Sequence, residues 1–144
     1  MEITTATSVI RTSAPAEPAS AEHRLRLALR ANAVFSVVTG AVALLAAPAV
    51  GGLLGVDAVW LIRLVGAGLL GFAAFVVWAS QLDPARLRQE ALQISIADLG
   101  WVGATIVALV AGTFSGSGPL VAALVGLAVL DLALAQLWFR HRTG

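Results

Sequence analysis

The sequence has no cysteine and no lysine, and it has few charged residues of either sign. The absence of cysteine excludes disulfides, thiolate metal sites and cysteine nucleophiles. Charged residues make up 12% of the 144 residues. Soluble domains carry roughly a quarter, so the low charge content argues against an ordinary soluble domain.

What the chain has instead is apolar sequence in long uninterrupted blocks. Hydrophobic residues make up 59% of the chain, and the mean hydropathy is +0.92. Each block has about 20 residues, the length that a helix needs to cross roughly 30 Å of hydrocarbon. We therefore expect an all-α integral membrane protein, a four-helix bundle with spans at about 26–47, 59–80, 91–111 and 119–139.

Two kinds of segment flank these spans. Residues 1–21 are rich in Thr, Ser, Ala and Pro, and we expect them to form a disordered tail before a single four-span domain at 22–144. Residues 49–56 are apolar but too few to cross, so we expect a turn or an interfacial piece. Asp83 followed by Pro84 predicts a helix N-terminus, with Asp83 as the cap.

The arginines predict the orientation of the chain. Eight of the nine lie in the N-terminal flank, in the turn after the second span and in the C-terminal tail. The positive-inside rule then places both termini in the cytoplasm. Arginine in place of lysine, with much Ala, Leu, Val and Gly, suggests a GC-rich bacterial genome and hence the bacterial inner membrane.

A stripe of small or polar residues at helical spacing follows each predicted span, and we expect these stripes to face one another. In the order of the four spans, the stripes are Asn32, Ser36, Gly40 and Ala43; Arg63, Ala67, Gly71 and Ala74; Ser95, Asp98, Trp101 or Val102, and Thr105; and Ala128, Asp131, Ala135 and Trp138. Trp60, Trp78 and Trp138 lie near span ends and are interpreted as interfacial anchors. A weak internal repeat relates 64–70 to 124–130 and the pair Asn32 and Phe35 to Asp98 and Trp101, which suggests a duplicated helical hairpin.

The polar residues within the spans are the candidate functional residues. Asp98 and Asp131 are each about 14 Å from an arginine that flanks the same side of the membrane, so we expect them at matching depth. Two neighbouring carboxyls in a low dielectric cannot both ionise readily, so one is expected to keep its proton. We take both as candidate catalytic groups, and we take Asn32, Ser36, Asp98, Trp101, Asp131 and Arg63 as candidate ligand-binding residues. Interhelical hydrogen bonding alone is the simpler alternative, and for Arg63 so is pairing with Asp57.

Three functions remain open, since no catalytic signature, phosphate loop or metal-ligand spacing is present. The first is binding or transport of a small amphiphilic, hydrophobic or cationic ligand, with transport requiring a homo-oligomer. The second is acid/base chemistry on a lipid-like substrate, as in an isomerase or cyclase. The third is an accessory subunit of a larger membrane complex. We expect no cofactor, no metal and no nucleic-acid partner; the lipid bilayer is the expected environment.

Overall fold

The computed structural model describes residues 17–143, and these residues form an all-helical fold. The helices are α1 (Glu17–Leu45), α2 (Ala47–Leu54), α3 (Val59–Ala79), α4 (Pro84–Val110) and α5 (Gly118–Arg142). All but α2 are long and apolar enough to cross a membrane. The prediction of four long apolar helices is therefore confirmed in the described part of the chain.

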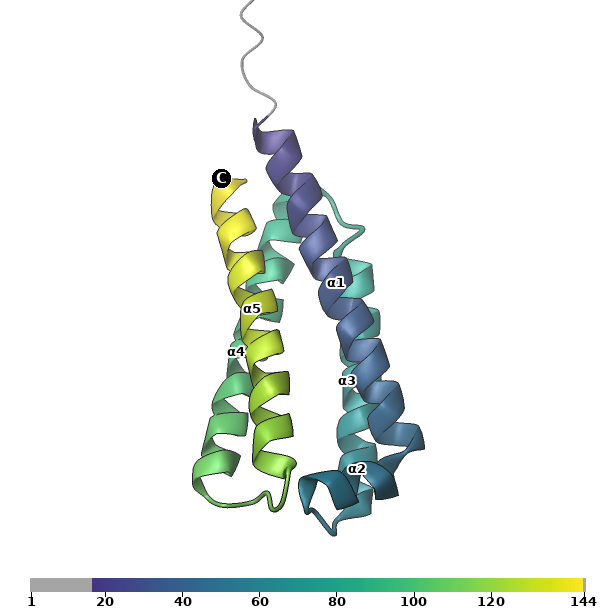
Figure 1. The fold of residues 1–144 in the computed structure, drawn as a ribbon. Helices are drawn as coiled ribbons and strands as arrows, with labels where there is room; N and C mark the ends of the chain where they lie inside the picture. The colour runs from purple at the N-terminus through teal and green to yellow at the C-terminus, as the bar shows by residue number, and fades with distance from the viewer. Residues whose placement is uncertain (1–16, 144) are drawn as a thin grey trace, which may run out of the picture.

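The four long helices form two antiparallel hairpins, α1 with α3 and α4 with α5 (Figure 1). Contact between the hairpins is made mainly by α1 and α5, whereas α3 and α4 touch each other little. Figure 1 shows the C-terminus, the start of α1 and the α3–α4 turn at one end of the bundle, which we call the terminal end. Helix α2 and the α4–α5 loop lie at the other, the loop end. The bundle is thus closest packed within hairpins and loosest between α3 and α4.

Two expectations about the flanking segments need correction. Residues 17–21, which we expected to be disordered, are helical and begin α1, and Ala21 is buried. The rest of the predicted tail, 1–16, lies outside the described residues. The segment 49–56 is mostly the short helix α2, with Pro48 in its first turn and Gly55 in the left-handed conformation that ends it.

At the terminal end of the bundle, side-chain hydrogen bonds stabilise the start of α4 and the end of α3. Asp83 accepts a hydrogen bond from the backbone N–H of Arg86 and caps α4, as predicted. The Arg26 guanidinium donates to the backbone carbonyls of Ser80 and Leu82, where α3 ends. Because the last carbonyls of a helix have no partner within it, this arginine stabilises the end of α3. Glu22 pairs with the same guanidinium at 2.8 Å.

At the loop end, the α4–α5 loop is hydrogen-bonded to the end of α2. The Ser115 backbone N–H donates to the Leu54 carbonyl at 3.1 Å, and the Ser117 hydroxyl donates to the Leu53 carbonyl at 3.1 Å. Gly118 lies against the Leu54 backbone so closely that no Cβ would fit there. The two hairpins are therefore connected at both ends, by the α3–α4 turn at the terminal end and by these hydrogen bonds at the loop end.

Buried positions recur in the two hairpins at a constant separation. Every buried residue of α4 has a buried counterpart in α1 lying 66 residues earlier, the separation of Asn32 from Asp98. In α5, the buried residues Ala122, Gly126, Ala133 and Gln136 have buried counterparts in α3 that lie 60 residues earlier. Each hairpin thus turns equivalent faces toward the bundle interior.

Candidate functional site

A cluster of buried polar side chains lies at the centre of the bundle, where α1, α4 and α5 meet. The Asn32 amide Nδ2 donates to Asp98 Oδ2 at 2.6 Å, and the Gln136 amide Nε2 donates to the same oxygen at 3.4 Å. The Ser95 hydroxyl lies 3.3 Å from Gln136 Oε1 and also donates to the Ala91 carbonyl at 2.8 Å. Three helices therefore contribute to one hydrogen-bonded group around the Asp98 carboxyl.

The members of this polar cluster are shielded from the surroundings. Asp98 is 5% exposed, Asn32 1% and Gln136 0%. A carboxyl in such a place needs hydrogen-bond donors, because an unpaired buried polar group costs free energy. Two amide groups supply those donors, and no described buried side-chain nitrogen or oxygen lacks a partner. The carboxyl is held in one position by side chains that cannot themselves ionise.

Beside the polar cluster lies a cavity of about 290 Å³, which we call the central cavity. Asn32, Ser36, Thr39 and Asp98 contribute its polar lining. The rest of its wall is apolar and includes three aromatic side chains, which are Phe35, Phe72 and Trp101. Small-molecule sites have this composition: mostly apolar walls with a few polar groups that orient the ligand.

The central cavity is open on one side and closed on another. Gly68 of α3 and Ala97 and Trp101 of α4 line it and are exposed, so it opens where α3 and α4 pack least. Toward the terminal end, a layer of buried apolar side chains lies next to the polar cluster and closes the bundle. This layer includes Leu25, Leu29, Leu87 and Ile94, none more than 1% exposed.

The structure brings together four of the six predicted ligand-binding residues. Asn32, Ser36, Asp98 and Trp101 all line the central cavity. Ser36 is the weakest of the polar contacts, since its hydroxyl lies 3.5 Å from Asn32 Oδ1. Trp101 lies one turn beyond Asp98 and is 37% exposed, at the open side.

Asp131 and Arg63 lie elsewhere. Asp131 is exposed on α5, on the face opposite Gln136, so the expected layer of two carboxyls is replaced by one carboxyl with two amides. The two-aspartate acid/base pair that we considered for an enzyme is therefore not assembled. Arg63 is exposed in the first turns of α3 and pairs with no carboxylate of residues 17–143, Asp57 included.

The predicted inner faces of two helices were wrong by a rotation of about one residue. In α3 the predicted stripe is exposed, and the buried residues are Ile62, Gly66, Ala73, Val76 and Ala79. In α5 the buried set is Gly118, Ala122, Gly126, Val129, Ala133 and Gln136. One residue turns a helix by about 100°, enough to move Asp131 from the interior to the surface. The predicted stripe of α1 is buried throughout, and that of α4 is buried at Ser95 and Asp98.

Gln136 is the functional candidate that the sequence reasoning missed. Gln136 is a neutral side chain in an apolar block. The charged Asp131 was instead taken to face inward, and the inner face of α5 was predicted from it. The internal repeat gave no usable signal for it, because the separation of 60 residues relates Gln136 to Val76, which the predicted inner face of α3 did not include, and relates Asp131 to Gly71, which it did. Phe35 and Phe72 were likewise not singled out as wall residues.

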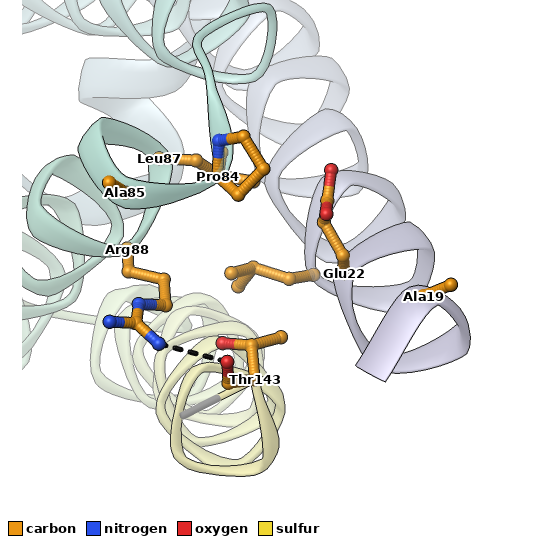
Figure 2. A pocket seen from close by; sticks show the side chains of 8 residues that line it. Ala19, Glu22, Pro84, Ala85, Leu87, Arg88 and Thr143 are labelled. Atoms are coloured by element: carbon orange, nitrogen blue, oxygen red, sulfur yellow. Dashed lines mark hydrogen bonds between the residues drawn. The ribbon is translucent and has the colours of Figure 1, made fainter. Parts of the chain in front are cut away.

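A second cavity, of about 470 Å³, lies at the terminal end (Figure 2). Its walls come from the start of α1, the start of α4 and Thr143, and they carry one acidic and one basic side chain, Glu22 and Arg88. Both charges already have partners. Glu22 pairs with Arg26, and the Arg88 guanidinium donates to the Thr143 carbonyl at 2.9 Å, as the dashed line in Figure 2 shows. This cavity therefore offers a ligand little that is unsatisfied.

Comparison with known proteins returned no match to a family model, to a curated protein or to a solved structure. Among residues 17–143 there is also no group of three His, Cys, Asp or Glu side chains that could hold a metal ion. The polar cluster and the central cavity are therefore the features of the structure that bear on function.

Proposed function

We propose that this protein is a four-span membrane protein that binds a small hydrophobic cation in the central cavity, with the Asp98 carboxylate facing the positive charge. The observation that carries the proposal is the position of Asp98. One carboxyl, held by Asn32 and Gln136, forms the polar corner of a cavity whose other walls are aromatic and aliphatic. An organic cation with an apolar body matches both parts of this lining.

The aromatic side chains support a cationic ligand over a neutral one. Faces of Trp and Phe attract ammonium groups through their quadrupoles, and the attraction grows when water is excluded. Trp101 and Phe35, one turn beyond Asp98 and Asn32 respectively, line the same cavity. The Asp98 carboxylate and the aromatic rings would thus both attract the positive charge of one bound ligand.

Entry from within the bilayer suits such a ligand. The proposed membrane places α3 and α4 in contact with lipid, so that the open side of the cavity faces the hydrocarbon. A hydrophobic cation concentrates in the membrane and could enter there without crossing an aqueous mouth. The apolar layer of Leu25, Leu29, Leu87 and Ile94 would hold the terminal end shut while the ligand is bound.

We place the protein in the inner membrane of a bacterium, with both termini in the cytoplasm. The support is the arginine distribution, because eight of nine arginines lie in the N-terminal flank, in the turn after the second span or in the C-terminal tail. Exposed Trp60, Trp78 and Trp138 lie toward helix ends, where tryptophan is favoured at a membrane interface.

We further propose that the two hairpins descend from one duplicated hairpin. Equivalent positions line the central cavity from both halves: Asn32 and Asp98, Phe35 and Trp101, Val65 and Val125, Leu69 and Val129. In many membrane transporters that are built from two repeats, the substrate site lies at the interface between the repeats. Asp98 breaks the equivalence, so the charge belongs to one half only.

The proposal is tested with two ligands that differ in charge alone. Phenyltrimethylammonium is a permanent cation, and tert-butylbenzene is its neutral isostere. In lipid nanodiscs, we expect saturable binding of the cation by ligand-observed NMR, and weaker binding of the hydrocarbon. Asp98→Asn should weaken cation binding by roughly 30-fold, since it removes a buried charge partner, and should leave tert-butylbenzene binding unchanged.

Asp57→Asn is the matched control. It makes the same change in an exposed residue outside the cavity, and cation binding should stay as in the native chain. Equal affinity of the native chain and the Asp98→Asn variant for the cation would contradict the proposal. So would a native chain that binds both ligands equally.

A further inference from the structure

The surface of α5 carries a regular stripe of exposed residues with a carboxyl near its middle. The stripe consists of Leu120, Leu124, Leu127, Asp131, Leu134 and Trp138. The spacing alternates between four and three residues, and the five apolar members are each more than half exposed. An apolar repeat of 3.5 residues is the pattern by which one helix packs along another as a coiled coil. We call this set the α5 seam.

Asp131 is the member of the α5 seam that needs an explanation. It is exposed, and among residues 17–143 it has no hydrogen-bond or ion-pair partner. Seven residues separate it from Trp138, which places it about 10 Å farther along the helix axis. If Trp138 lies at the membrane interface, Asp131 lies in the hydrocarbon, where an isolated carboxylate costs roughly 2.5–3.5 kcal/mol on insertion scales. A polar group of another molecule at that depth would offset this cost.

We infer that the α5 seam is the interface between two copies of this chain, which pack α5 against α5 around a two-fold axis with Asp131 of each copy facing the other. Copies inserted in the same orientation have parallel α5 helices, so symmetry brings the two carboxyls to one depth. Such an interface is self-complementary. Two carboxyl groups that meet at one depth can hydrogen-bond to each other, so the interface needs no third molecule.

The size and composition of the α5 seam fit this occupant. Its five apolar side chains expose on the order of 500 Å² in one copy, so a dimer would bury about 1,000 Å² in total, the minimum expected of a biological interface. A single polar residue within an apolar heptad seam also fixes the register and the number of helices that associate. A different partner would have to bring its own polar group to this depth, whereas a second copy supplies it by symmetry.

The chain offers a clean test because it has no cysteine of its own. Leu127→Cys and Leu134→Cys place single thiols in the α5 seam on either side of Asp131. Oxidation in native membranes should convert either full-length variant to a disulfide-linked dimer of twice the chain mass. Val107→Cys, a matched control on exposed α4, should remain monomeric.

A second measurement tests the role of the carboxyl. The dissociation constant of the dimer in detergent, measured by energy transfer between labelled copies, should rise roughly tenfold for Asp131→Leu, because the intramembrane hydrogen bond is lost. Asp131→Asn retains a hydrogen-bonding side chain and should stay within about threefold of the native value.

Several results would overturn the inference. Absence of dimer from both seam cysteines, or equal dimer from Val107→Cys, would show that the seam does not join two copies. Cross-linking of the seam cysteines to a different membrane protein would assign the surface to that partner. An unchanged dissociation constant for Asp131→Leu would show that the carboxyl does not hold the interface. None of these results bears on cation binding in the central cavity, which the Asp98 experiments test separately.

Discussion

At the scale of single residues, Asn32 contributes most to holding the Asp98 carboxyl in the polar cluster. Its amide donates the shortest hydrogen bond that Asp98 receives, at 2.6 Å, while Gln136 donates at 3.4 Å. Gln136 also accepts from Ser95, whose hydroxyl has the Ala91 carbonyl as a second acceptor. Loss of Asn32 would leave Asp98 with the longer bond only, whereas Ser95 would keep a partner if Gln136 were lost.

We therefore expect Asn32→Leu to destabilise the fold by about 1–2 kcal/mol, because the buried Asp98 loses its best donor. Ser36→Ala, one turn along the same buried face, should change stability by less than about 0.5 kcal/mol, since its contact to Asn32 is 3.5 Å long. Titration with sodium dodecyl sulfate, followed by tryptophan fluorescence, measures both free energies of unfolding. Equal losses would contradict the ranking.

At the scale of helices, the close approach of α1 and α3 depends on two glycines. A Cβ placed on Gly66 would lie 2.7 Å from the Leu44 backbone nitrogen and 2.8 Å from the Gly40 carbonyl oxygen. A Cβ placed on Gly40 would lie 2.9 Å from the Gly66 carbonyl oxygen. Backbone atoms cannot move aside as a flexible side chain can, so any side chain here forces the helices apart.

Gly66→Ala should therefore lower the free energy of unfolding by about 1–3 kcal/mol through overpacking. Gly71→Ala is the matched control: it lies in the same helix, and its Cβ would meet nothing within 4 Å. That variant should be neutral or slightly stabilising, since alanine is the better helix former. A thermal unfolding series in one detergent compares the two, and similar melting temperatures would refute the close-packing argument.

At the scale of the whole molecule, the arrangement of the ends bears on the proposed topology. The C-terminus, the start of α1 and the α3–α4 turn share one end of the bundle, which is also the arginine-rich end (Figure 1). A bundle with this polarity can take only two orientations in a membrane. The positive-inside rule favours the one with the terminal end in the cytoplasm.

Single cysteines distinguish the two orientations. Thr113→Cys in the α4–α5 loop should react with a membrane-impermeant maleimide added to intact cells, because the loop end is expected outside. Gln81→Cys in the α3–α4 turn should react only after the cells are permeabilised. The reverse pattern would show that the protein is inserted the other way and would remove the cytoplasmic assignment of both termini.

The number and order of the long helices followed from the sequence alone, although α1 begins earlier than predicted. Long apolar blocks can satisfy their backbone hydrogen bonds only within themselves, so their length and their boundaries at Pro84 and Pro119 are local properties. The depth of Asp98 along α4 was also local, because rise per residue is constant. These are properties that each helix would have without its neighbours.

The rotation of each helix about its axis was decided only by the tertiary structure. In α3 and α5 apolar and small residues occur on every side, so hydrophobicity gives no preferred inner face, and the fit of Gly66 against Gly40 selects one. In α5, Gly118 lies against the Leu54 backbone, and the same rotation brings Gln136 inward to Asp98 and leaves Asp131 at the surface. The number of long helices and the position of each residue along its helix are set by local hydrophobicity and helix geometry. Which polar groups meet depends on the steric fit between helices, and that fit exists only once they pack.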